Sequence, residues 1–207
     1  MPRFLLRDSD ALLSTSYKVM YSSFVESGLE EIDGPAFAAI AATRARDPGF
    51  RHLMAVRDPY ARLASFFADK LRRDLERNSG AWQFCQMIFF PLLGIGLGDG
   101  FETVRDALRS ISFEGFIDML PRVCGNGHLR PQVNLLAVEG LDLKACTRIF
   151  PIETEAERLW TCLGIARPPR ANSSEALPSL ESLRRDQLDL VNTLYAEDFE
   201  SFGYAMR

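Results

Sequence analysis

A lysine and two serines follow the first apolar run of the chain. Lys18, Ser22 and Ser23 lie in the stretch KVMYSSF, directly after ALLSTS, which has the length and composition of a short strand. An ammonium group and two hydroxyls at the start of a following helix can donate hydrogen bonds to phosphate or sulfate oxygens. The stretch lacks the glycines of GxxxxGK[ST], so it does not match an ordinary ATP loop. A plainer interpretation makes Lys18 a surface residue and Ser22 a helix N-cap.

A second strand-to-helix junction carries two arginines and a serine. In the stretch AVRDPYARLASFF, Arg57 comes directly after an apolar run of strand length, and Arg62 and Ser65 lie on the helix that follows. Arg57 and Ser65 can bind one anion if the turn folds the arginine back over the first turns of this helix, and Asp58 can orient an arginine. The alternative makes Asp58 a helix cap and leaves both arginines solvated. It gives no reason for an arginine directly at the strand end.

Alternating strands and helices must position these two junctions. Apolar runs at residues 11–16, 52–56 and 146–152 have strand length. Helical spacing predicts helices at residues 33–46, 60–77, 101–111, 112–123, 153–165 and 181–204. The strand, loop and helix order predicts an α/β protein, a P-loop-like three-layer fold with a short central parallel sheet flanked by helices and a helix-rich C-terminal half. In such sheets, ligands bind beyond the carboxyl ends of the strands.

The overall composition narrows the class of protein. The chain has 207 residues, of which 47% are hydrophobic, and this fits a single domain over residues 1–207. The formal net charge of −4 does not provide the basic surface that nucleic-acid binding favours. We therefore expect no nucleic-acid partner.

The cysteines and the apolar runs bear on metals and on the cell compartment. The four cysteines are widely spaced and form no CxxC or Cys/His cluster, so we expect reduced thiols and no metal site. The first thirty residues show neither a signal peptide nor a membrane anchor. The most apolar internal run, residues 87–97, is interrupted by proline and glycine and is too short to span a bilayer. We expect a soluble, cytoplasmic protein.

The second junction resembles a known family. VRDPYARLASFFADKL is similar to the 3′-phosphate-binding segment of sulfotransferases that use 3′-phosphoadenylyl sulfate (PAPS), especially the carbohydrate group with its RDPxxRxxS pattern. KVMYSSF resembles the 5′-phosphosulfate segment, PKxxxTS, with Tyr17 in place of the proline and Ser22 in place of threonine or cysteine. SFEGFIDML, HLRPQVNLL, IFPIET and YAEDFESFGY resemble further family segments in the expected order. The chain is most similar to a compact bacterial-type member.

The resemblance implies roles for the residues of both junctions. Lys18 would stabilise the departing phosphate oxygen, and Arg62 would either assist at the 3′-phosphate or hold Asp58. PAPS would be the co-substrate, and the scheme requires no metal. The residues implied in donor binding are Lys18, Ser22, Ser23, Arg57, Arg62 and Ser65.

A general base must remove the proton of the acceptor hydroxyl. His128, in the glycine-rich CGNGHLRPQ, lies in a segment expected to be flexible, and either catalysis at the acceptor site or a hydrogen bond that stabilises the loop explains it. His52 lies at the amino end of its strand, so we expect a partly exposed structural residue. Glu26, Glu30 and Glu31 are rival bases, although such a run is more typical of a solvated helix face.

The acceptor is the least defined part of the prediction. The resemblance implies a small-molecule or glycan hydroxyl, in a carbohydrate or glycoconjugate, with specificity in residues 77–100 and 122–135. Two alternatives are a non-catalytic relative that binds a nucleotide or a partner, and a P-loop-like kinase, which would need a glycine-rich loop and magnesium carboxylates. The sequence does not indicate an oligomeric state.

Overall fold

The chain forms two compact units that interleave along the sequence. The computed structural model describes residues 1–6, 11–44, 46–77, 82–137, 141, 143–166, 168 and 177–207. The first unit, here the sheet unit, comprises Met1–Pro59, Pro131–Ser173 and Glu197–Met206. The second, here the helical unit, comprises Tyr60–Arg130, Ser174–Ala196 and Arg207. Among the described residues, no helix has both the length and the apolar character needed to cross a membrane.

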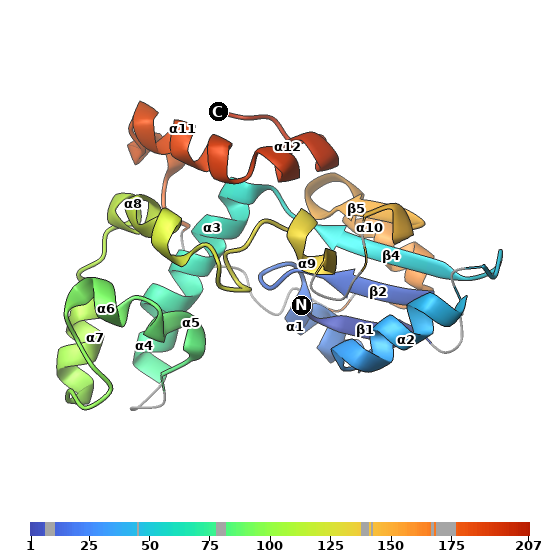
Figure 1. Cartoon of the computed structure of the whole chain (residues 1–207), viewed down its shortest axis with the longest axis horizontal. Helices are drawn as coiled ribbons and strands as arrows, with labels where there is room; N and C mark the ends of the chain where they lie inside the picture. The colour runs from blue at the N-terminus through green and yellow to red at the C-terminus, as the bar shows by residue number, and fades with distance from the viewer. Residues whose placement is uncertain are drawn as a thin grey trace. The chain divides into compact units, whose positions relative to one another are not determined.

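A five-stranded mixed sheet organises the sheet unit (Figure 1). Its strands are β1 (Arg3–Leu6), β2 (Ala11–Thr15), β3 (Glu30–Glu31), β4 (Arg51–Val56) and β5 (Arg148–Pro151). The order is β3-β1-β2-β4-β5, in which β2, β4 and β5 run parallel and β1 is antiparallel to both of its neighbours. The three predicted strands therefore form the parallel core, which confirms the α/β prediction. The short strands β1 and β3 were not predicted.

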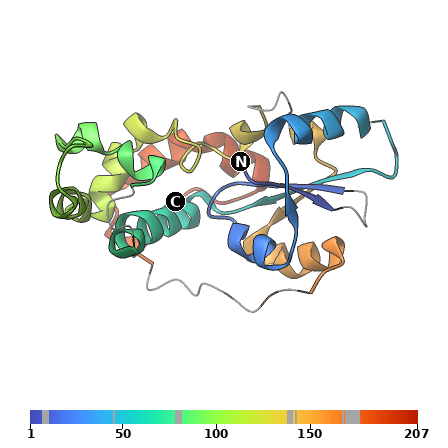
Figure 2. The ribbon, with the colours of Figure 1, turned by 90° about the horizontal axis from the view of Figure 1, so that it is seen from below.

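Helices cover both faces of this sheet, as Figure 2 shows. On one face lie α1 (Tyr21–Glu26) and α10 (Ile152–Leu163), and on the other lies α2 (Gly34–Arg44). Alternation along the strands explains the layers, because successive side chains point to opposite faces. In β2, Leu13 packs in the cluster that includes α1 and α10, whereas Leu12 packs against α2. The three-layer prediction is confirmed.

Two short helices complete the sheet unit. They are α9 (Val133–Ala137) and α12 (Ala196–Phe202). Leu136 of α9 and Phe202 of α12 pack with Met54 and Val56 of β4. The predicted closing helix 181–204 is therefore wrong as one element, because α11 (Arg185–Leu194) ends before Tyr195, whose φ of −115° interrupts the helix before α12.

The helical unit is built around stacked phenylalanines. Its helices are α3 (Pro59–Ala68, which begins in the sheet unit), α4 (Asp74–Arg77), α5 (Phe84–Met87), α6 (Phe90–Leu93), α7 (Phe101–Arg109), α8 (Phe113–Val123) and α11. Phe66 of α3 stacks on Phe116 of α8 with ring centroids 5.6 Å apart. Ser112 caps α8, which confirms the predicted start of this helix, and Pro121 lies inside the helix without ending it. The predicted helix 60–77 exists with a π-helical turn, Asp69–Arg73, between α3 and α4.

His52 is buried in the core of the sheet unit. It is the second residue of β4, at the predicted amino end, but only 1% of it is exposed, so the expected partial exposure is wrong. Its Nε2 lies 3.1 Å from the Ser14 hydroxyl, and its ring meets Phe37 of α2 edge to face at 5.2 Å. Burial disfavours the charged imidazolium and lowers the pKa of His52 from its usual 6.5 to about 4.

This pKa predicts a loss of stability in acid. Between pH 6.5 and 4 the unfolded chain binds a proton at His52 that the folded chain excludes, so stability is full above pH 6.5 and falls as the pH drops toward 4. We expect the free energy of unfolding to fall by roughly 3 kcal/mol more in the wild type than in His52→Gln. Urea denaturation at pH 7, 6, 5 and 4 measures this. Parallel pH profiles for the two proteins would contradict the assignment.

Candidate functional site

The carboxyl ends of the three parallel strands lie at the same end of the sheet. Because β2 pairs in parallel with β4, and β4 with β5, their carboxyl ends lie side by side (Figure 1). The chain leaves β2 through residues 16–20, here the first loop, and β4 through residues 57–58, here the second loop. After β5 it enters α10 directly. The residues predicted to bind anions in the sheet unit all lie on or beside these two loops.

The first loop makes a tight turn with two left-handed residues. Lys18 has a φ of 71° and Met20 a φ of 55°, a region that L-residues with a Cβ rarely adopt. The Thr15 hydroxyl donates to the carbonyl of Val19 at 2.8 Å and holds the turn closed. Val19 is fully buried, whereas Lys18 is partly exposed. Strained residues that the surrounding structure holds in place are common at binding sites.

Both predicted serines lie in the first turn of α1. Ser22 is exposed and Ser23 is half-buried. Met20 occupies the N-cap position, and no side chain caps this helix end. The interpretation of Ser22 as an N-cap is therefore wrong, and its hydroxyl faces solvent. The predicted placement of both serines at the start of the helix is confirmed.

Arg57 folds back onto the first loop. Its Nη1 donates to the backbone carbonyl of Lys18 at 3.1 Å, and its Nε lies 3.9 Å from Oε1 of Glu153. The Arg57 side chain is 22% exposed. The two loops that the sequence singled out are therefore neighbours beyond the carboxyl ends of β2 and β4.

The buried side-chain amide of Gln132 makes hydrogen bonds to both loops. Gln132 Oε1 accepts hydrogen bonds from the Ser16 hydroxyl and from the Arg57 backbone N–H, both at 3.0 Å. Its Nε2 donates to the Arg57 carbonyl at 2.7 Å and to Oδ2 of Asp198 at 3.3 Å. Ser16, Gln132 and Asp198 are each 0% exposed. Because it is fully buried, Gln132 lies beneath the two loops and connects them within the protein.

Glu153 ties the second loop to the end of β5. Its Oε1 accepts from the backbone N–H of Asp58 at 3.1 Å, and its Oε2 accepts from the Tyr204 hydroxyl at 2.7 Å. The same hydroxyl lies 3.3 Å from the carbonyl of Val56. Burial and this carboxylate raise the pKa of Tyr204 above its usual value, so the hydroxyl keeps its proton. Glu153 and Tyr204 thus fix the backbone of the second loop at Asp58 and at the preceding Val56.

Arg62, in the helical unit, is buried and holds a loop. It is 1% exposed, and its guanidinium donates to the carbonyls of His128, Leu129 and Arg130 at 3.2, 3.4 and 2.6 Å. The Tyr195 hydroxyl donates to the Leu129 carbonyl as well, at 2.6 Å. The expectation of a flexible segment around His128 is therefore wrong. At 1% exposure, Arg62 offers almost no surface for the predicted contact with a phosphate.

Asn126 contacts both the backbone and the ring of His128. Oδ1 of Asn126 accepts from the His128 backbone N–H at 2.9 Å and lies 3.3 Å from Nδ1 of the ring. An amide oxygen beside Nδ1 favours a proton on that nitrogen. His128 is half-buried, as is Ser65 on α3. The functions expected of His128 and Ser65 stay predictions.

The rival glutamates lie elsewhere in the sheet unit. Glu30 and Glu31 form the edge strand β3, which β1 separates from β2, so the expected helix face is wrong for them. Glu31 accepts a hydrogen bond from the Tyr21 hydroxyl at 2.9 Å, and this raises the pKa of Tyr21. Glu26 is the exposed last residue of α1. These positions weaken all three as candidate bases.

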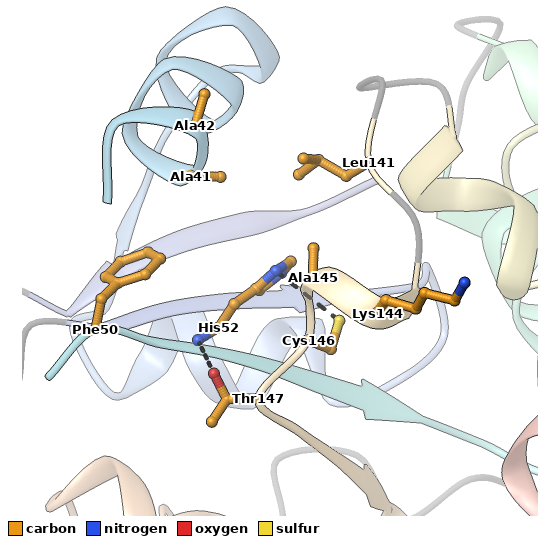
Figure 3. Close-up of a pocket in the computed structure, with 9 residues that line it drawn as sticks. All are labelled: Ala41, Ala42, Phe50, His52, Leu141, Lys144, Ala145, Cys146 and Thr147. Atoms are coloured by element: carbon orange, nitrogen blue, oxygen red, sulfur yellow. Dashed lines mark hydrogen bonds between the residues drawn. The ribbon is translucent and has the colours of Figure 1, made fainter. Parts of the chain in front are cut away.

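A cavity of about 370 Å³ opens at the opposite end of β4 (Figure 3). Figure 3 shows the His52 ring directed toward Cys146, whose sulfur lies 3.9 Å from Nδ1. The lining residues are Ala41, Ala42, Phe50, His52, Leu141, Lys144, Ala145, Cys146 and Thr147. This cavity is remote from the two loops along β4 and shares no residue with them. Over the described part of the chain, no group of three or more His, Cys, Asp or Glu side chains is arranged to hold a metal ion.

A comparison with models of known protein families identifies the family of this chain. A family model described as "Sulfotransferase family" matches residues 40–205. The chain belongs to the sulfotransferase family. This match contains the second loop, Gln132, Glu153 and Asp198, whereas the first loop precedes it. No curated protein and no solved structure shows significant similarity to this sulfotransferase.

The contacts of Arg62 predict a structural role that can be measured. Arg62→Met keeps the aliphatic stem but removes the guanidinium bonds to the His128 and Arg130 carbonyls and leaves the Leu129 carbonyl with Tyr195 alone, so we expect the free energy of unfolding to fall by about 3 kcal/mol. Arg130→Met is the matched control, because Arg130 makes one exposed bond to the carbonyl of Gly125 and its loss should cost less than about 1 kcal/mol. Urea denaturation compares the two variants. Equal losses would show that Arg62 does not hold this loop.

Proposed function

We propose that this sulfotransferase moves the sulfuryl group of PAPS to a hydroxyl acceptor by in-line displacement. The observation that carries the proposal is the 3.1 Å hydrogen bond from the Arg57 guanidinium to the carbonyl of Lys18. It joins the two loops whose sequences resemble the 5′-phosphosulfate and 3′-phosphate segments of PAPS-dependent enzymes. A donor with phosphates at both ends of one nucleoside suits two neighbouring cationic loops.

Lys18 and the serines are assigned to the 5′ end of the donor. The acceptor oxygen bonds to sulfur while the bond from sulfur to the bridging phosphate oxygen breaks, and negative charge grows on that oxygen. The Lys18 ammonium stabilises this charge, and the hydroxyls of Ser22 and Ser23 hold the phosphosulfate. An ammonium in this position supplies the charge stabilisation that a metal ion supplies in kinases, so the scheme requires no metal.

Arg57 is assigned to the 3′-phosphate. Its guanidinium reaches the first loop through the bond to the Lys18 carbonyl, and a planar fork of donors suits a phosphate. Glu153, 3.9 Å from Nε, orients the guanidinium. Ser65 is assigned to the same phosphate from the RDPxxRxxS resemblance alone.

His128 is assigned as the general base. An imidazole nitrogen that carries no proton is what a base needs to accept the proton of the acceptor hydroxyl. The acceptor is proposed to be a carbohydrate or glycoconjugate hydroxyl, because the RDPxxRxxS pattern is most similar to the carbohydrate group. The proton thus ends on His128 and the sulfuryl group on the acceptor oxygen.

Binding of 3′-phosphoadenosine 5′-phosphate, the donor product, tests the proposal. We expect calorimetry to show that it binds at least tenfold more tightly than ATP with magnesium, because the 3′-phosphate adds a charge-assisted contact. Turnover of sulfate-labelled PAPS over a panel of sugars, lipids and phenols then tests catalysis. Preference for ATP with magnesium would indicate a kinase. Product binding without turnover on any acceptor would indicate a non-catalytic relative.

The two cationic side chains should have separable effects. Lys18→Ala removes charge stabilisation that matters most in the transition state, so we expect kcat to fall on the order of 100-fold with a smaller change in donor affinity. Arg57→Ala should mainly weaken donor binding, by about 30-fold in Kd. Lys144→Ala, an exposed lysine beside the remote cavity, is the control and should change neither value. Small and equal effects from both site variants would contradict the assignments.

A further inference from the structure

The amide of Gln132 is saturated by hydrogen bonds from two separate loops. A primary amide has two donor hydrogens and two acceptor lone pairs. Oε1 accepts from Ser16 and from the Arg57 N–H, while Nε2 donates to the Arg57 carbonyl and to Asp198. All four positions are therefore used, in a side chain that is 0% exposed. Neither loop can shift relative to the other without leaving a buried polar group unpaired.

Asp198 of α12 fixes the orientation of this amide. Its Oδ2 accepts from the backbone N–H of Gln132 at 2.8 Å as well as from Nε2, and its Oδ1 accepts from the N–H of Val133 at 2.9 Å. Because a carboxylate only accepts, the amide nitrogen must face it and the oxygen must face the loops. A flipped amide would set two acceptors against each other in a buried site, which is strongly unfavourable.

The spacing of the two loops matters for a ligand with two charged ends. When two contacts are joined in one molecule, the second contact strengthens binding only if both can be made at once. A change in loop spacing would leave the affinity for a ligand with one phosphate almost unchanged. For a ligand with two phosphates, it would remove the gain in affinity that the second phosphate provides.

We propose that Gln132 is a positioning residue that couples the two loops and thereby sets the selectivity of the enzyme for a 3′-phosphate. This inference rests on the proposed function for the identity of the ligand. Gln132 has no exposed surface, so it acts through Ser16 and Arg57 and makes no contact with the donor. The coupling itself is a property of the protein alone and can be measured without a ligand.

The selectivity is tested with a pair of nucleotides that differ only in the 3′-phosphate. We expect Gln132→Met to lower the ratio of Kd for adenosine 5′-monophosphate to Kd for 3′-phosphoadenosine 5′-phosphate by about tenfold. The Kd for the monophosphate should stay within about threefold of the wild-type value. Ser16→Ala, which removes one of the four bonds, should give an intermediate ratio. An unchanged ratio, or an equal weakening of both nucleotides, would overturn the inference.

A core variant separates this effect from a general loss of stability. Phe37→Leu creates a cavity between α2 and the sheet, in the cluster that contains Leu12 and Ala41 and no residue of either loop. It should lower stability and leave the nucleotide ratio unchanged. If Phe37→Leu lowers the ratio as much as Gln132→Met does, the positioning role is wrong.

Hydrogen exchange in the absence of nucleotide decides the coupling directly. In Gln132→Met we expect faster exchange both at the Arg57 amide, which has lost its acceptor, and at the Val19 amide, which bonds to Ser16. Faster exchange at Arg57 alone would overturn the coupling. Failure of the wild type to bind either nucleotide would instead overturn the proposed function, and the exchange result would still decide whether Gln132 couples the loops.

Discussion

The four hydrogen bonds of the Gln132 side chain are the constraint on which the loops at the carboxyl ends of β2 and β4 depend. Parallel pairing brings the ends of β2 and β4 together, but beyond their last ladder bonds the strands no longer fix the chain. The polar groups that follow, at Ser16 and Arg57, are then left inside the protein and need partners. One amide satisfies both loops at once. The backbone of Arg57 is thereby fixed, and the first loop, which carries Lys18, is anchored at Ser16.

The first loop is held in a conformation that its own residues do not favour. Left-handed backbone at Lys18 and Met20 costs roughly 1–2 kcal/mol per residue, and glycine would remove that cost. The bond from Thr15 to the Val19 carbonyl and the full burial of Val19 offset it. A glycine at position 18 would lack the ammonium group that the proposed reaction needs. The chain therefore combines a strained turn with a charged side chain, and the rigid sheet behind it stabilises the turn.

The sequence predicts the parallel core because buried strands appear as continuous apolar runs, as in HLMAV of β4. It misses β1 and β3 because strands of four and two residues depend on their pairing partners more than on their own composition. Patterns at the junctions identify Lys18 and Arg57, since both lie next to strand ends. They do not identify the burial of Arg62, whose acceptors lie 66 to 68 residues further along the chain. The patterns do not identify the roles of Gln132 and Asp198 for the same reason, because the contacts of these residues span 65 residues or more.

The contribution of α12 to the sheet unit has a consequence for biosynthesis. Asp198 orients the amide that sets both loops, yet it is made long after β2 and β4 have left the ribosome. A nascent chain that ends before α12 can form the parallel strands, but its glutamine has no carboxylate to orient it. Contacts this distant in sequence also form late and slowly in folding. The two loops would thus reach their final spacing only after α12 has been synthesised, and shorter nascent chains would lack the fixed arrangement of the strand ends.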